Sequence, residues 1–96
     1  VQAELFLVGP SGEEVIATAM AGYEGHRGWI NYLAVAPVYR RRGYGRRLMR
    51  RVEEVLGALG CPKINLQVRT RNTDVIQFYK RIGYTEDAVV SLGKRL

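Results

Sequence analysis

Residues 33–49 read LAVAPVYRRRGYGRRLM, and within this stretch the chain changes from one kind of secondary structure to another. Apolar residues continue up to Pro37, which lacks a backbone N–H for sheet pairing and therefore ends a strand. From Tyr44 onward, apolar residues recur every three or four positions, which is typical of an amphipathic helix. The arginines and glycines of residues 38–46 therefore lie in a turn that joins a strand to the start of a helix.

Toward the C-terminus the same signals predict three more elements. The helix that starts at Tyr44 should end before Gly60, because glycine is a common helix terminator and Pro62 prevents continuation. Residues 63–69 alternate between apolar and polar side chains, which predicts a strand. A second helix up to Gly83 follows, and residues 87–92 read as a last strand. Three residues in front of the second helix could cap it: Asn72, Thr73 and Asp74.

Toward the N-terminus the sequence predicts an antiparallel meander. Residues 4–8, 14–23 and 29–36 are short, apolar stretches that read as strands, and residues 9–13 and 24–28 read as turns between them. The predicted order is β-β-β-α-β-α-β, an α/β domain with a mixed sheet, in which the middle β-α-β is a right-handed parallel crossover. A chain of 96 residues has room for one hydrophobic core, so we predict a single domain over residues 1–96.

Positive charge is concentrated in residues 38–51, which hold seven of the 15 lysines and arginines. The remaining residues are nearly neutral in total, with eight basic side chains against nine acidic ones. A local excess of this kind indicates an anionic partner at one site. The first N–H groups of a helix have no internal partner, and two glycines allow close approach of a ligand, so the turn could bind phosphates. A nucleic-acid patch and a solvated helix end remain alternatives.

The single cysteine and the single histidine limit the chemistry. Cys61 has no second cysteine for an intramolecular disulfide, which is typical of a reducing compartment, so we predict a cytoplasmic location. Cys61 and His26 fall short of a metal-ligand set, so we predict no metal. The sequence contains neither a membrane-spanning apolar run nor a signal peptide. The chain begins at Val1, which indicates processing, truncation or a preceding segment.

Two motifs resemble those of the GNAT (Gcn5-related) N-acetyltransferases. The first is a strand that ends in V-x-P, followed by R-x-x-G-x-G at the start of a helix, where Arg40, Gly43 and Gly45 occupy the fixed positions. The second is Asn72 with FYKRIGY at residues 78–84, which is similar to the asparagine and the F-Y-x-x-x-G-F/Y segment of the family. The segments GCPKI and SLGKRL look most like the bacterial YpeA branch.

The resemblance implies transfer of an acetyl group from acetyl-CoA to an amine of a small molecule or peptide, without a metal. It implies that the strand over residues 29–36 separates from its parallel neighbour over residues 63–69, and that the pantetheine arm enters the gap. The backbone of Leu33 and Val35 would pair with the pantetheine amides, and the N–H groups of residues 41–46 would hold the pyrophosphate. The implied acetyl-CoA contacts are Leu33, Ala34, Val35, Arg40, Arg41, Arg42, Gly43, Tyr44, Gly45, Arg46 and Asn72.

The resemblance also implies a general acid, Tyr79, which would donate a proton to the departing thiolate. A half-buried core tyrosine and a simple helix cap are the structural alternatives for Tyr79 and Asn72. The general base is not identified. Glu24 and His26 have suitable side chains but lie in a turn far from the expected gap, whereas Asn31 or Tyr32 could hold a water that relays the proton.

The chain departs from the family at its start, because a strand and two helices usually precede the meander. We therefore expect an N-terminally short domain with apolar surface exposed on one face of the sheet, which a homodimer could cover. The alternative function is a non-catalytic basic module that binds CoA alone or nucleic acid. Nucleic-acid binding favours basic residues spread among stacking aromatics, and only Tyr39 and Tyr44 lie near the arginines. We thus predict no specific nucleic-acid partner and no membrane.

Overall fold

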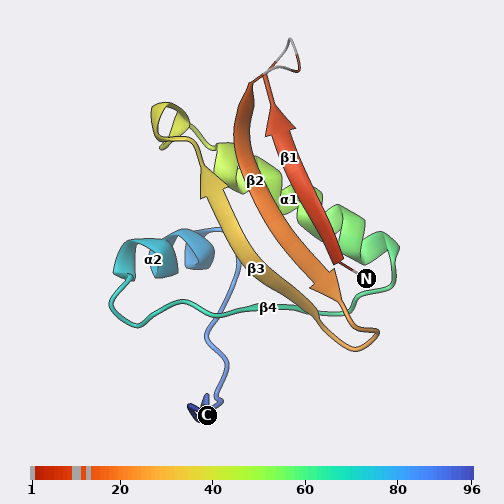
Figure 1. Cartoon of the computed structure of the whole chain (residues 1–96), viewed down its shortest axis with the longest axis vertical. Coiled ribbons are helices and arrows are strands. Elements are labelled where there is room, and N and C mark those ends of the chain that lie inside the picture. The colour runs from red at the N-terminus through yellow and green to blue at the C-terminus, as the bar shows by residue number, and fades with distance from the viewer. Residues whose placement is uncertain (1, 10–11, 13) are drawn as a thin grey trace.

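The computed structural model describes residues 2–9, 12 and 14–96, and it contains a four-stranded sheet with a long helix across one face (Figure 1). Val1 and residues 10, 11 and 13 of the predicted first turn lie outside the described residues. The strand order is β1-β2-β3-β4, antiparallel except for the parallel pair β3 and β4. The mixed α/β class and the parallel crossover are thus confirmed. The elements are β1 (Gln2–Val8), β2 (Val15–Tyr23), β3 (Gly28–Val35), the short 3₁₀ helix η1 (Pro37–Tyr39), α1 (Tyr44–Ala58), β4 (Ile64–Leu66) and α2 (Thr73–Arg81).

The core lies between the sheet and α1. Three alanines of β2 point toward this helix, and their small side chains let it approach the sheet closely. One face of α1 carries large apolar side chains that pack against these alanines. Each such side chain stabilises the fold by roughly 1.5–3 kcal/mol when it is fully buried. The alanines are Ala17, Ala19 and Ala21, and the buried helix residues are Leu48, Met49, Val52 and Leu56.

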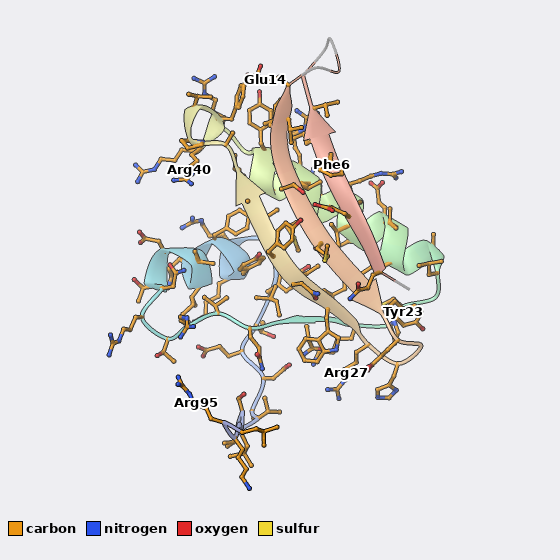
Figure 2. All side chains as sticks on the ribbon, viewed as in Figure 1. Phe6, Glu14, Tyr23, Arg27, Arg40 and Arg95 are labelled. Carbon is orange, nitrogen blue, oxygen red and sulfur yellow. The ribbon has the colours of Figure 1, made fainter. Side chains whose placement is uncertain are left out.

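The opposite face of the sheet is not covered by a helix of the described residues (Figure 1). On β1, Leu5 and Leu7 pack against the core, so the alternate residues point to the uncovered face. Phe6, labelled in Figure 2, is 55% exposed there, and Tyr32 of β3 is 38% exposed. The expected apolar surface on one face of the sheet is therefore present.

The prediction of a last strand over residues 87–92 is wrong: α2 is the last regular element, and residues 87–92 form no strand. This segment is attached by side chains instead: Lys63 Nζ lies 2.9 Å from Asp87 Oδ1, and Asn65 Nδ2 donates to Asp87 Oδ2 at 2.8 Å. Beyond Asp87 the chain leaves the domain (Figure 1), and Val89 and Val90 are 78% and 83% exposed. Apolar, β-branched residues form a strand where they pair and bury one face, whereas Val89, Val90 and Leu92 stay exposed here.

Candidate functional site

A cleft opens where β3 and β4 separate. The two strands pair over only three positions, Gly28 with Ile64, Trp29 with Asn65, and Ile30 with Leu66. The register between β2 and β3 shifts at the same level and leaves Asn31 as the extra residue of a β-bulge. Because a bulge bends the strand that contains it, β3 turns away from residues 67–69. This accounts for the length of β4, which ends at Leu66 although a strand was predicted over residues 63–69.

The cleft has a volume of about 340 Å³ and is bounded by β3, by the segment after β4 and by α2. This volume lies at the lower end of the range for small-ligand pockets, as expected for one arm of an extended ligand. Five residues singled out from the sequence line it: Asn31, Tyr32, Leu33, Asn72 and Tyr79. The structure therefore brings together the strand, the asparagine and the tyrosine that the two motifs contributed separately.

The backbone of β3 offers hydrogen-bonding groups to this cleft. The N–H of Ala36 donates to the C=O of Ile16 on β2 at 2.8 Å. Since backbone groups of successive strand residues alternate in direction, Ala34 also faces β2, whereas Leu33 and Val35 face the open edge. Leu33 and Val35 thus have the orientation expected for pairing with an extended ligand. Ala34, also expected among the contacts, directs its backbone at β2 instead.

The turn that precedes α1 has an unusual backbone. Arg41 and Gly43 have positive φ angles of 63° and 81°, and Gly43 occupies the N-cap position of the helix. No side chain caps this end and no acidic residue lies in the first turn, while Arg47 N–H donates to Gly43 C=O at 3.1 Å. The N–H groups of residues 44–46 therefore lack intrahelical partners, and the helix dipole makes this end positive. An anion is the ligand that such an end binds best.

The two glycines of the turn have different functions in the fold. A Cβ at Gly43 would meet no atom within 4 Å, so glycine is favoured there by its positive φ. A Cβ at Gly45 would lie 3.3 Å from Cζ of Phe78 and 3.6 Å from Cγ2 of Val35. Glycine at position 45 thus also has a packing function, because it lets α1 approach α2 and the end of β3 closely. This contact also places the positive helix end beside the cleft.

The arginines around the turn divide into two groups. Arg40 Nε donates to the C=O of Val35 at 3.2 Å, which ties the turn to the end of β3. On the helix, Arg47 lies over the ring of Tyr44 at 5.7 Å, and Arg51 pairs with Glu54 at 3.1 Å with both side chains well exposed. Exposed pairs of this kind contribute little to stability. The helix arginines therefore form a solvated surface, which was one of the alternatives that the sequence left open.

Tyr79 combines burial with access to the cleft. It is 8% exposed, and its ring contacts those of Phe78 and Tyr84 edge-on, with centroids 5.0 and 5.5 Å away. Burial raises the pKa of the Tyr79 phenol above its ordinary value, so the hydroxyl stays protonated at neutral pH. Asn72 occupies the N-cap position of α2, but its side chain makes no capping hydrogen bond. Its amide is therefore available to a ligand in the cleft.

The two side chains considered as general base, Glu24 and His26, lie outside the cleft, as expected from the sequence. Glu24 and His26 are exposed in the hairpin before β3, while the cleft starts only beyond Ile30. Sequence reasoning missed Glu4, whose carboxylate accepts a hydrogen bond from the Tyr32 hydroxyl. The available signal was that Glu4 is the only charged residue in the sequences of the first three strands.

Two findings concern other ligands and membranes. Within residues 2–9, 12 and 14–96, no group of three or more His, Cys, Asp or Glu side chains could hold a metal ion. In the same part of the chain, neither helix combines the length and the apolar composition that crossing a membrane requires.

Sequence comparison relates these features to known proteins. The profile of the acetyltransferase (GNAT) family matches residues 1–84. The chain belongs to the GNAT family. It is 50% identical over 94 residues to an acetyltransferase of Sodalis glossinidius (strain morsitans), and 45% identical over 93 residues to an acetyltransferase of Yersinia pestis (strain Pestoides F). Each alignment covers 97% of this chain and 66% of the relative, so the chain spans about two thirds of these proteins.

Solved structures of other GNAT proteins have the same fold. AAC(6')-Iy in complex with the bisubstrate analogue CoA-S-monomethyl-acetylneamine superposes with a TM-score of 0.82 at 20% identity, over 99% of this chain and 70% of that one. A putative acetyl transferase from Pyrococcus furiosus superposes with a TM-score of 0.81 at 20% identity, over 99% of this chain and 66% of that one. The ribosomal-protein-S18-alanine N-acetyltransferase from Escherichia coli superposes with a TM-score of 0.81 at 25% identity, over 91% of this chain and 55% of that one. The assignment to the YpeA branch stays a prediction.

Proposed function

We propose that this GNAT domain transfers an acetyl group from acetyl-CoA to an amine of a small molecule or peptide. The observation that carries the proposal is the cleft between β3 and the segment after β4, together with the uncapped N-terminus of α1. Gly45 at this helix end packs against Val35 of β3 and Phe78 of α2, and both of these elements bound the cleft. One ligand that joins a pyrophosphate to an extended amide-containing arm suits both features. Acetyl-CoA has this composition, and the AAC(6')-Iy structure contains a CoA analogue on the same fold.

The donor would be held by backbone groups and arginines. The N–H groups of residues 44–46 would bind the pyrophosphate, and Arg41, Arg42 and Arg46, which are exposed around this turn, would add charge-assisted hydrogen bonds. The pantetheine arm would run along the open edge of β3 and pair with the backbone of Leu33 and Val35. The amide of Asn72, which does not cap α2, would bind the same arm.

The chemistry requires a neutral amine to attack the thioester carbonyl carbon. A C–N bond forms, the C–S bond breaks, and the departing sulfur takes up negative charge. Tyr79 would stabilise this sulfur by donating its hydrogen bond or its proton, because burial keeps the phenol protonated. A water held at Asn31 or Tyr32, which both line the cleft, would take the proton that the amine releases.

The chain's location and assembly follow as parts of the same proposal. A free thiol, Cys61, suits the cytoplasm, where thiols stay reduced. A second copy of the chain could cover the apolar sheet face around Phe6. A basic nucleic-acid module is less favoured, because the helix arginines form a solvated, partly paired surface and not a groove with stacking aromatics.

The test compares Gly43, in the turn before α1, with Gly60, which follows the same helix and has a similar backbone conformation. Gly43 and Gly60 both have positive φ, at 81° and 88°, and in both a Cβ would meet no atom within 4 Å. Alanine at either position should therefore cost similar stability, but only Gly43→Ala changes the turn before α1. We expect Gly43→Ala to weaken acetyl-CoA binding about tenfold, roughly the loss of one charge-assisted hydrogen bond. Equal calorimetric affinities of the two folded variants would contradict the assignment of the turn to the donor.

A further inference from the structure

The uncovered face of the sheet carries a fixed carboxylate. Glu4 on β1, Met20 on β2 and Tyr32 on β3 lie directly opposite one another across the three strands. The Tyr32 hydroxyl donates a hydrogen bond to Oε1 of Glu4, and the Thr18 hydroxyl donates to the same oxygen at 3.4 Å. These two donors orient the carboxylate of an edge strand across the sheet and toward β3.

Tyr32 connects this carboxylate to the cleft, because Tyr32 lines the cleft and is still 38% exposed on the sheet face. By sequence, Glu4 is the only charged residue in β1, β2 and β3, whereas the whole chain carries a net charge of +6. The hydrogen bond to Glu4 is the main cause that raises the pKa of Tyr32, as expected beside an ionised carboxylate. A negative charge therefore lies on the uncovered sheet face, beside Met20, and is linked to the cleft through the side chain of Tyr32.

The two faces of the sheet thus differ in the ligand charge that they favour. The N-terminus of α1 and its arginines favour the phosphates of the donor, whereas the uncovered face presents Glu4 to a cation. The nitrogen that attacks the thioester must be neutral, so a positive charge held by Glu4 in the reacting complex belongs to a different nitrogen. An acceptor that satisfies both conditions has at least two amino groups.

We propose that Glu4, positioned by Tyr32 and Thr18, binds an ammonium group of the acceptor, and that the acceptor is a diamine or a larger polycationic amine. This inference rests on the proposed function. It makes Glu4 a specificity-determining residue, which selects acceptors by a charge at a distance from the reacting nitrogen.

The experiment uses two amines with the same four-carbon chain, 1,4-diaminobutane and n-butylamine, of which only the first has a second ammonium group. Each is titrated into ¹⁵N-labelled protein at low ionic strength, with and without CoA, while backbone amide shifts are followed. We expect the diamine to shift the amides of Glu4 and Tyr32. Glu4→Gln should weaken diamine binding about fivefold, the scale of one partly exposed ion pair, and leave n-butylamine unchanged.

Two variants separate charge from structure. Glutamine at position 4 keeps a carbonyl oxygen for the Tyr32 hydroxyl, so Glu4→Gln removes the charge and leaves an acceptor in place. Glu14→Gln is the matched control, because Glu14 also shares a hydrogen bond with a tyrosine, Tyr39, and lies directly before β2 (Figure 2). Glu14→Gln should bind the diamine like the parent.

The outcomes distinguish this inference from the proposed function. Equal binding of both amines by the parent, undetectable diamine binding, or parental diamine affinity in Glu4→Gln would each overturn the acceptor site. CoA binding is followed in the same samples through the amides of residues 40–46. If those amides do not respond to CoA while the diamine response still depends on Glu4, the proposed function fails, and Glu4 remains a diamine-binding residue that serves no acetyl acceptor.

Discussion

Gly28, where β3 begins, has no room for a side chain. A Cβ at this position would lie 2.9 Å from Sγ of Cys61, 3.0 Å from Cδ1 of Leu56 and 3.3 Å from Cγ1 of Ile64. Carbon atoms in favourable contact are about 3.5–4.0 Å apart, so all three neighbours would have to move. The backbone cannot easily retreat, because the N–H of Gly28 donates to the C=O of Lys63 at 2.8 Å. Gly28→Ala should therefore overpack the junction between α1, β3 and β4.

The expected cost can be estimated from these neighbours. Adding a carbon to a packed core typically costs about 1–3 kcal/mol. Cys61 is only partly buried and can rotate, but Leu56 is 2% exposed and is enclosed by the core. We therefore expect Gly28→Ala to lower the free energy of unfolding by about 2 kcal/mol. For a domain of this size that corresponds to a fall in Tm of roughly 8–16 °C.

The assay is urea unfolding followed by circular dichroism, with Gly57→Ala as the matched control. Gly57 lies in α1, and a Cβ there would meet no atom within 4 Å, so the same substitution should stabilise the helix by up to about 1 kcal/mol. Cys61→Ala in the Gly28→Ala background removes the closest obstacle and should restore part of the loss. If Gly28→Ala unfolds at the parental urea midpoint, the steric reasoning is wrong.

Tyr79→Phe removes only the hydroxyl, so we expect kcat with an accepted amine to fall about 10²–10⁴-fold while acetyl-CoA affinity hardly changes; parental turnover would exclude Tyr79 as the acid. Arg41→Gly relieves a positive φ of 63° and should raise the free energy of unfolding by about 1–2 kcal/mol in urea titrations. Burial and the 2.7 Å hydrogen bond to Glu53 raise the pKa of Tyr84 in the folded protein. As the pH rises above about 10, the unfolded chain therefore loses this proton before the folded protein does, and the free energy of unfolding should fall. Tyr84→Phe should flatten this part of the Tm profile, and an unchanged slope would assign the loss to other groups. Binding to a labelled DNA duplex should be weak and should disappear at physiological salt, whereas tight, selective binding there would favour a nucleic-acid module.

The sequence alone determined the features that depend on neighbouring residues. The start of α1 at Tyr44 follows from Pro37, the glycines and the apolar period, and α2 begins at Thr73, one of the three residues considered as caps. Family membership was also readable, because the motif around Arg40, Gly43 and Gly45 and the motif at residues 78–84 are local patterns. Helices and turns satisfy most of their backbone groups within a few residues, so short windows contain the necessary information.

Only the tertiary structure decided the features that need a partner from elsewhere in the chain. Residues 87–92 have the composition of a strand but do not pair with the sheet, and β4 ends at Leu66 because the bulge at Asn31 bends β3 away. Glu4 and Tyr32 are 28 positions apart and meet only because β1, β2 and β3 pair in one register. Sheet pairing and burial are interactions between distant segments, and the spacing of residues along the chain does not specify them.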